Sequence, residues 1–227
     1  MQIAGLVLAA GASLRMGTPK ALLPWGGGCF VDAVVSILKH AGASLVVVVT
    51  RAELYPAVVE RVGGRACVLV NPEPDRGMNS SIRVGVDYLV SGRNPFAGVA
   101  LHPVDQPGIL VSTARCLLEA FHSQPDRLVL PVAISGLHQD GGGVYRRIAV
   151  TGNTQEGAVS TSRRGHPVIF PRDLWHDLYN ENPAGARTVV WQNAHRVLEV
   201  PVEDRGAFTN VNTPDDFRRL TCLEALL

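Results

Sequence analysis

The chain has 227 residues, of which 46% are hydrophobic, so it can bury the core of one large domain or two small ones. Its 21 Lys and Arg residues against 20 Asp and Glu residues give a formal charge of +1, which argues against a nucleic-acid-binding protein, because that class carries a basic surplus. The four cysteines form no CxxC pair, and the N-terminus lacks the basic start of a signal peptide. No apolar run reaches the ~20 residues of a membrane span. We therefore expect a cytoplasmic protein without membrane contact.

Short apolar runs alternate with segments of helical spacing along the first 132 residues. The predicted strands are 3–8, 44–50, 66–70, 97–101 and 127–132, and the predicted helices are 31–40, 53–61, 80–89 and 112–121. Strands such as 44–50 (SLVVVVT) lack polar alternation, which predicts a sheet covered by helices on both faces. The order of these elements indicates an α/β fold with a largely parallel sheet.

The pattern changes after residue 132. Residues 133–161 are predicted to form an inserted hairpin around the turn HQDGGG, and the polar, aperiodic stretch 151–164 is expected to be mobile. Beyond it, 168–170 and 196–200 are predicted strands, and 214–226 is a predicted closing helix with Thr213 as its N-cap. Because no repeat or linker interrupts the chain, we expect a single domain over residues 1–227 with an insertion at about 133–161.

Three unusual segments follow predicted strands. These are 9–20, 71–81 and 102–107. Ligands of parallel α/β sheets bind beyond the carboxyl ends of the strands. We therefore expect these segments to converge on one site.

The first of these segments, with the residue before it, reads LAAGASLRMGTPK (residues 8–20). Gly11 and Gly17 would let backbone amides approach a polyphosphate, and Arg15 and Lys20 place two cations in the same loop. The loop is not a Walker A motif, because it has no Gly-Lys-Ser/Thr, and it is not GxGxxG. An anion-binding loop is the favoured interpretation over an ordinary turn between a strand and a helix.

The pattern LAAGxSxRMGxxK resembles the signature of the MobA-like nucleotidyltransferases, especially their molybdenum cofactor cytidylyltransferase branch. The resemblance covers nearly the whole chain, because RGMNSSIRVG (76–85), PVDQP (103–107), GHPVIF (165–170) and NVNTPDDF (210–217) occur in the family's order. It implies a Rossmann-like three-layer sandwich of the nucleotide-diphospho-sugar transferase type, with a mainly parallel, mixed central sheet.

The resemblance also implies roles at matching positions. Arg15 and Lys20 would hold the phosphates and act in catalysis with Asp105, and Gly77 and Ser81 belong to the segment that closes over the base. Ser80 or Ser81 could instead cap the following helix. Backbone groups of the first loop would line the nucleotide, namely those of Leu8, Ala9, Ala10 and Gly11.

The same resemblance places a Mg²⁺ ion on Asp105 and Asn212. Mg²⁺ prefers oxygen ligands and takes few of them from protein. Many cytidylyltransferase relatives have DxDTPED where this chain has Asn210 and Asn212, so the second ligand here is a neutral carbonyl. Guanylyltransferase-type and sugar-nucleotide relatives tolerate Asn at that place.

The implied reaction transfers CMP from CTP to the phosphate of molybdopterin cofactor and releases pyrophosphate. LAAG favours CTP, since guanylyl-transferring relatives tend to have LAGG. A transient contact with a molybdoenzyme or its chaperone is also implied. Alternatives are a guanylyl- or sugar-phosphate nucleotidyltransferase of the same fold and a non-catalytic maturation factor that carries the cofactor. A nicotinamide-dependent oxidoreductase would need GxGxxG.

Three further residues either meet an anionic acceptor or form a solvated basic turn: Arg163, Arg164 and His166.

Overall fold

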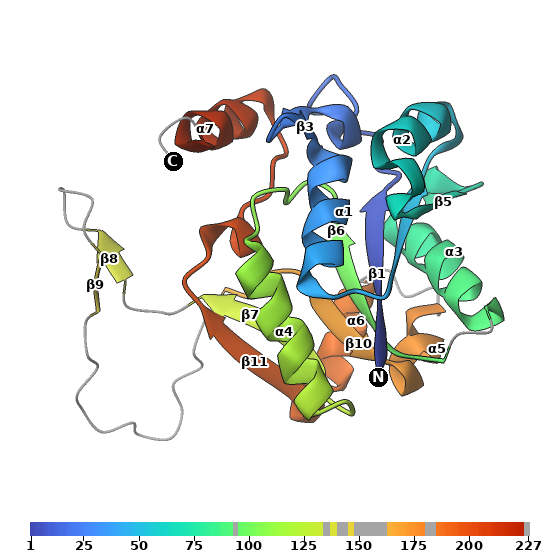
Figure 1. Ribbon diagram of the computed structural model, residues 1–227, viewed down its shortest axis with the longest axis vertical. Coiled ribbons are helices and arrows are strands. Elements are labelled where there is room, and N and C mark those ends of the chain that lie inside the picture. Colours follow the sequence, from blue (N-terminus) through green and yellow to red (C-terminus); the bar gives the residue numbers. More distant parts are fainter. Residues whose placement is uncertain (93–94, 134–136, 140–144, 148–162, 180–184, 225–227) are drawn as a thin grey trace.

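A computed structural model describes residues 1–92, 95–133, 137–139, 145–147, 163–179 and 185–224 (Figure 1). Within these residues the centre is a seven-stranded sheet of order β11-β7-β10-β6-β1-β4-β5. β10 runs antiparallel to both of its neighbours and the other pairs are parallel, which confirms the mainly parallel, mixed sheet. The strands are β1 (Gln2–Ala9), β4 (Leu45–Thr50), β5 (Cys67–Val70), β6 (Phe96–Pro103), β7 (Leu128–Ala133), β10 (Val168–Pro171) and β11 (Val197–Val202).

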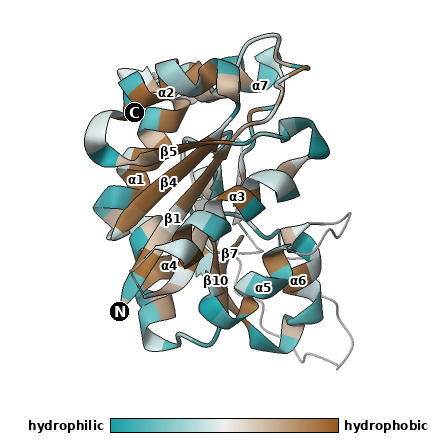
Figure 2. Ribbon diagram, turned by 90° about the vertical axis from the view of Figure 1, so that its right-hand side faces the viewer, coloured by the Kyte–Doolittle hydropathy of each residue, from teal (hydrophilic) through white to brown (hydrophobic). Residues whose placement is uncertain are grey.

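Helices cover both faces of the sheet and give three layers (Figure 2). One face packs against α1 (Phe30–Ala41), α2 (Tyr55–Val62) and α4 (Val111–Ser123), and the other against α3 (Met78–Ser91), α5 (Trp175–Tyr179) and α6 (Ala186–Gln192). The fully buried residues of β4 alternate between the two cores, because successive side chains of a strand point to opposite faces. This explains why the strand sequence LVVVVT shows no polar alternation.

The strands and helices predicted for the first 132 residues all form, with ends shifted by a few residues. β8 (Leu137–Gln139) and β9 (Tyr145–Arg147) pair antiparallel, which confirms the predicted hairpin. The rest of the insertion, including most of the stretch expected to be mobile, lies outside the described residues. The single domain stays a prediction. In the described part of the chain, no helix combines the length and apolar character of a membrane span.

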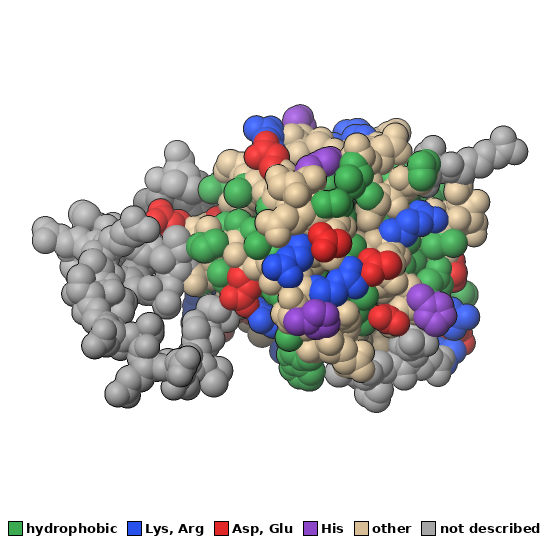
Figure 3. Space-filling view, turned by 90° about the horizontal axis from the view of Figure 1, so that it is seen from below, with side chains coloured by type: hydrophobic (Ala, Val, Ile, Leu, Met, Phe, Trp, Pro, Cys, Tyr) green, Lys and Arg blue, Asp and Glu red, His purple; other side chains and the backbone are tan. Residues whose placement is uncertain are grey.

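The side of the sheet where the strands end differs from the side where they begin. At the edge where β1 and β6 end, the loops of the three unusual segments meet. Figure 3 views the molecule from the opposite side, where β1 begins, and there basic and acidic side chains are interspersed without a patch of one sign. The described residues on this side thus show no charged patch that would mark a ligand site.

Two histidines lie behind this carboxyl edge, His102 buried and His166 partly buried. His102, on β6, is 1% exposed, and its Nε2 lies 3.0 Å from the backbone oxygen of Gln106. The ring of His166 stands edge-on to that of His102, with 6.4 Å between ring centroids. Burial lowers the pKa of each imidazole to about 4, and neither Nδ1 atom has a hydrogen-bond partner among the described residues. Both rings are therefore neutral at pH 7.

Replacement of Gly98 on β6 should destabilise the fold. A Cβ at this position would lie 2.5 Å from Cζ of Phe121 on α4, whose side chain is fully buried. We expect Gly98→Ala to lower the free energy of unfolding by about 1–3 kcal/mol, as overpacking does. Urea denaturation measures this, with Gly64→Ala as control, because a Cβ at Gly64 meets nothing within 4 Å. Equal midpoints for the two variants would contradict the packing argument.

His102 and His166 should make the free energy of unfolding depend on pH. Their pKa values of about 4 in the folded state lie below the ~6.5 of an unfolded chain, so the unfolded state binds more protons and stability falls as pH drops from about 6.5 toward 4. Between pH 7.5 and pH 5 each histidine should remove about 2 kcal/mol. His102→Gln keeps a donor for the Gln106 carbonyl and should lose about 2 kcal/mol less than the wild type over this range. Parallel pH profiles in urea denaturation would rule this out.

Candidate functional site

A cavity of about 640 Å³ opens at the carboxyl edge of the sheet. Loops after β1, β5 and β6 line it, together with the segment that precedes helix α7 (Pro214–Glu224). The three segments expected to converge therefore do so. The ten residues that the sequence predicted to bind the nucleotide and metal or to act in catalysis line this cavity: Leu8, Ala9, Ala10, Gly11, Arg15, Lys20, Gly77, Ser81, Asp105 and Asn212.

The loop after β1 turns sharply at two residues with left-handed backbone. Ser13 has φ 52° and Gly17 has φ 71°. The Ser13 carbonyl accepts hydrogen bonds from the backbone N–H groups of Met16 (2.9 Å) and Gly17 (3.1 Å). Its hydroxyl oxygen accepts a third, from the backbone N–H of Lys20, at 3.0 Å. Ser13 thus fixes the backbone at Lys20.

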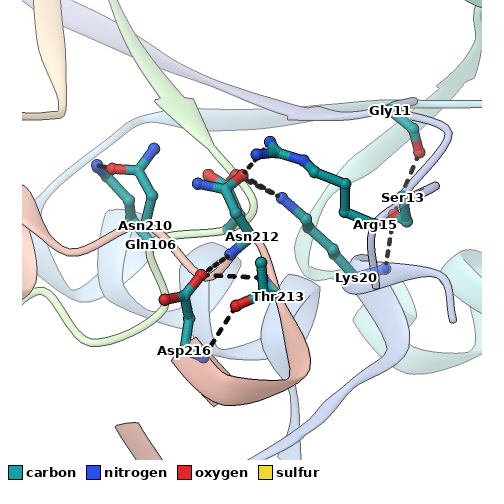
Figure 4. Close-up of polar contacts among 10 residues, drawn as sticks. Gly11, Ser13, Arg15, Lys20, Gln106, Asn210, Asn212, Thr213 and Asp216 are labelled. Carbon is teal, nitrogen blue, oxygen red and sulfur yellow. Dashed lines mark hydrogen bonds and ion pairs between the residues drawn. The ribbon is translucent and has the colours of Figure 1, made fainter. Parts of the chain in front are cut away.

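Polar side chains from three parts of the sequence meet at Lys20 and Arg15, as Figure 4 shows for Asn212. Its Nζ lies 3.0 Å from Oδ2 of Asp105 and 2.8 Å from Oδ1 of Asn212. Nη2 of Arg15 donates to the same Asn212 oxygen at 3.2 Å. The side chains of Lys20 and Asp105 are only 15% and 17% exposed, so water screens this ion pair less than a surface pair.

Asn212 is held in place by the N-terminus of α7. Oδ2 of Asp216 accepts hydrogen bonds from the backbone N–H groups of Asn212 (3.0 Å) and Thr213 (2.9 Å). The N–H of Asn212 and the Thr213 hydroxyl are the main causes that lower the pKa of Asp216. The Thr213 hydroxyl oxygen in turn accepts from the N–H of Asp216 at 3.2 Å, which confirms the predicted cap. The N–H of Val211 also donates to the Asp105 carbonyl at 2.9 Å.

The segment expected to close over a base begins helix α3. Gly77 has φ 88° and is the N-cap, so the alternative in which Ser80 or Ser81 caps this helix is wrong. Ser81 is 5% exposed, and its hydroxyl oxygen accepts from Nδ2 of Asn71 at 2.9 Å. Asn71, itself buried, also donates to Ser80 (2.8 Å) and was not singled out from the sequence. Its position directly after β5 is the signal that could have identified it.

The three basic residues around the GHP turn behave differently from one another. Arg164 pairs with Glu199 at 2.8 Å and Arg163 donates to the backbone oxygen of Phe208, and neither lines the cavity. His166 does line it. Of the three, only His166 is placed at this cavity, and a contact of Arg163 or Arg164 with an acceptor stays a prediction.

A second polar pair, missed in the sequence, connects two of the family motifs. Nε2 of Gln106 donates to Oδ1 of Asn210 at 2.7 Å, and Gln106 is 2% exposed. Asn210 lines the cavity. This pair, with the backbone contact between Val211 and Asp105, joins the loop after β6 to the C-terminal segment.

The oxygen atoms of Asp105 and Asn212 suit a hard divalent cation. Oδ1 of Asp105 is buried without a hydrogen-bond partner among the described residues, so it can accept a further ligand. Elsewhere in that part of the chain no group of three His, Cys, Asp or Glu residues could hold a metal. A two-ligand site fits Mg²⁺, which completes its coordination with phosphate oxygens and water.

Known proteins are similar to this chain in sequence. A 34% identical stretch of 127 residues covers 56% of this chain and 59% of a probable molybdenum cofactor guanylyltransferase from Rhodopirellula baltica. A nicotine blue oxidoreductase from Paenarthrobacter nicotinovorans is 28% identical over 96% of both chains. A molybdenum cofactor guanylyltransferase from Cupriavidus metallidurans is 27% identical, covering 94% of this chain and 92% of its own.

Solved structures share the whole fold. The crystal structure of Rv0371c from Mycobacterium tuberculosis has a TM-score of 0.71 at 24% identity and covers 97% of this chain and 98% of its own. Rv0371c in complex with manganese has a TM-score of 0.64 at 22% identity, with the same coverage. The family model of the MobA-like NTP transferase domain matches residues 5–197. The chain therefore belongs to the MobA-like NTP transferase family.

Proposed function

We propose that the protein transfers a nucleotidyl group from a nucleoside triphosphate to a phosphorylated small molecule and releases pyrophosphate. The observation that carries this proposal is the meeting of Lys20 and Arg15 with the oxygen pair of Asp105 and Asn212 inside one cavity. Two cations beside a metal-compatible oxygen pair match the charge of a metal–triphosphate complex. Membership in the family supports the same reaction class.

In the proposed reaction an oxygen of the acceptor phosphate attacks the α-phosphorus in line, and the bond to pyrophosphate breaks. A phosphomonoester has a second pKa of about 6, so it is already ionised near neutral pH and needs no general base. Lys20 and Arg15 stabilise the charge on the phosphoryl oxygens and on the departing pyrophosphate. Asp105 and Asn212 would hold Mg²⁺, which when bound neutralises phosphate charge. The manganese complex of Rv0371c supports a divalent cation in this fold.

We favour CTP as donor and molybdopterin cofactor as acceptor. The LAAG segment supports CTP, whereas the relatives from R. baltica and C. metallidurans, both named guanylyltransferases, support GTP. Pyrophosphate release measured with each of the four common nucleoside triphosphates, Mg²⁺ and molybdopterin cofactor decides between them. Release with GTP alone would overturn the choice of base.

A different chemistry is suggested by the nicotine blue oxidoreductase, which is similar over the full length. A nicotinamide-dependent oxidoreductase, which the lack of GxGxxG disfavours, would oxidise NADH or NADPH when an electron acceptor is supplied and lower the absorbance at their characteristic wavelength, without pyrophosphate release. A non-catalytic cofactor carrier would show neither signal. The same protein sample therefore separates all three functions in two assays.

The acceptor should contact the wall formed by Asp105, His166 and Asn210. The loop after β1 and the start of α3 form the other walls, which we assign to the triphosphate and its base. Because burial keeps His166 neutral at pH 7, it would act as a hydrogen-bonding group and not as a cation. It would thus recognise a polar group of the acceptor other than its phosphate.

Removal of either charged partner in the cavity should abolish most turnover. We expect Lys20→Ala and Asp105→Ala to lower kcat by about 10²–10³, the usual loss for an electrostatic group that acts in the transition state. Pyrophosphate release under saturating substrates measures this. Lys39→Ala is the matched control, because Lys39, the second of two lysines in the chain, is exposed on α1. Near-wild-type kcat in a folded Lys20→Ala or Asp105→Ala variant would refute the assignment.

Replacement of His166 should affect the acceptor more than the donor. We expect His166→Ala to raise KM for the acceptor about three- to tenfold, the loss of one hydrogen bond, and to leave KM for the triphosphate nearly unchanged. His166→Gln, which keeps a donor and an acceptor, should restore part of the affinity. The exposed His176 serves as control. An equal rise in both KM values would indicate a structural role only.

A further inference from the structure

The side chain of Lys20 lies where a metal ion would have to bind. Its Nζ is 3.0 Å from Asp105 Oδ2 and 2.8 Å from Asn212 Oδ1, the two side chains whose oxygens suit a divalent cation. Arg15 donates to the same Asn212 oxygen at 3.2 Å (Figure 4). Each of these two oxygens therefore already has a cationic donor, whereas Oδ1 of Asp105 has no hydrogen-bond partner among the described residues.

An ammonium group and a divalent cation cannot share this oxygen pair. A Mg²⁺ ion needs its oxygen ligands at about 2.0–2.1 Å, so an ammonium that keeps its contacts to the same side chains would be forced against the metal. Like charges repel strongly at such a separation where little water screens them, and Lys20 and Asp105 are each less than a fifth exposed. Lys20 must move before a metal can bind to both residues.

A polyphosphate provides the means for this movement. The backbone at Lys20 is fixed by Ser13, but the four-carbon side chain can carry the ammonium from Asp105 to a phosphate oxygen. Arg15 lines the same cavity and can follow. The movement frees oxygens of Asp105 and Asn212 just when phosphate oxygens arrive to complete the coordination of the metal.

We propose that Lys20 closes the Asp105–Asn212 oxygen pair to divalent cations in the free protein, and that a triphosphate opens it. The metal then binds together with the triphosphate and not before it. This inference rests on the proposed function only in assuming that the cavity binds a triphosphate. Lys20 thereby acts as a positioning residue that sets the order of binding, besides its contact with the phosphates.

Binding of Mn²⁺ tests the proposal without turnover. Free Mn²⁺ is measured by electron paramagnetic resonance in solutions of the full chain without nucleotide. The wild type and the control Lys39→Met should bind weakly, and Lys20→Met and Lys20→Gln should bind at least about tenfold more tightly, because a neutral side chain no longer repels the metal. Asp105→Asn added to Lys20→Met should remove the gained site.

A second arm uses inorganic triphosphate, which avoids the choice of base. Equilibrium dialysis should show that the wild type binds Mn²⁺ when triphosphate is present. Tight Mn²⁺ binding by the wild type alone, or no gain in either folded Lys20 variant, would overturn the proposal. Pyrophosphate release is scored separately, so an inactive wild type that shows the expected Mn²⁺ pattern would refute the proposed function and leave the role of Lys20 intact.

Discussion

The parallel pairing of β1 with β6 is the constraint on which the site depends. The pairing places Leu8 opposite Pro103, and the backbone N–H of Val104 then donates to the Leu8 carbonyl at 3.1 Å. This last contact extends the ladder by one residue beyond the strand and fixes where the two loops separate. Lys20 and Asp105, 85 positions apart in sequence, meet because their loops leave the sheet at this one point. A shift in register would turn every buried side chain of the strand to the other face.

The other half of the site is held by polar contacts and not by the sheet. Asn212 belongs to no strand, and it is placed by Asp216 at the start of α7 and by the bond from Val211 to the Asp105 carbonyl. Gln106 and Asn210 add a side-chain bond to the same junction. The rigid sheet edge thus positions the carboxylate, and a capped helix positions the neutral oxygen.

Much of the fold followed from the sequence because its strands are uninterrupted apolar runs and its loops are rich in Gly, Ser and Asn. Helix α6 did not, since its Thr188-Val189-Val190 run is β-branched and lowers helix propensity, while packing against the sheet stabilises the helix. The antiparallel place of β10 between β6 and β7 also could not be predicted, because periodicity identifies a strand but not its partners. Tertiary contacts decide both features.

In the candidate site, too, some features could be predicted from the sequence and others depend on tertiary contacts. The ten residues predicted to bind the nucleotide and metal all line the cavity, because the segments that carry them follow a strand or precede a helix. The three basic residues around the GHP turn look alike in sequence but have different contacts. Arg164 pairs with Glu199, Arg163 donates to a backbone oxygen, and of the three only His166 lines the cavity. Local sequence cannot tell which basic side chain has a distant partner. Only the folded chain assigns these side chains.

The neutral side chain at position 212 gives the cluster its electrostatic character. The four side chains in mutual contact carry two positive charges on Arg15 and Lys20, one negative charge on Asp105, and none on Asn212. A second carboxylate there would balance the two cations and hold them more strongly. With Asn212 the cluster keeps a net positive charge, which attracts a polyanion and disfavours a free divalent cation. The amide can still ligate a metal once phosphate charge has arrived. A neutral side chain at position 212 therefore weakens metal binding by the protein alone and favours a metal site that the substrate completes.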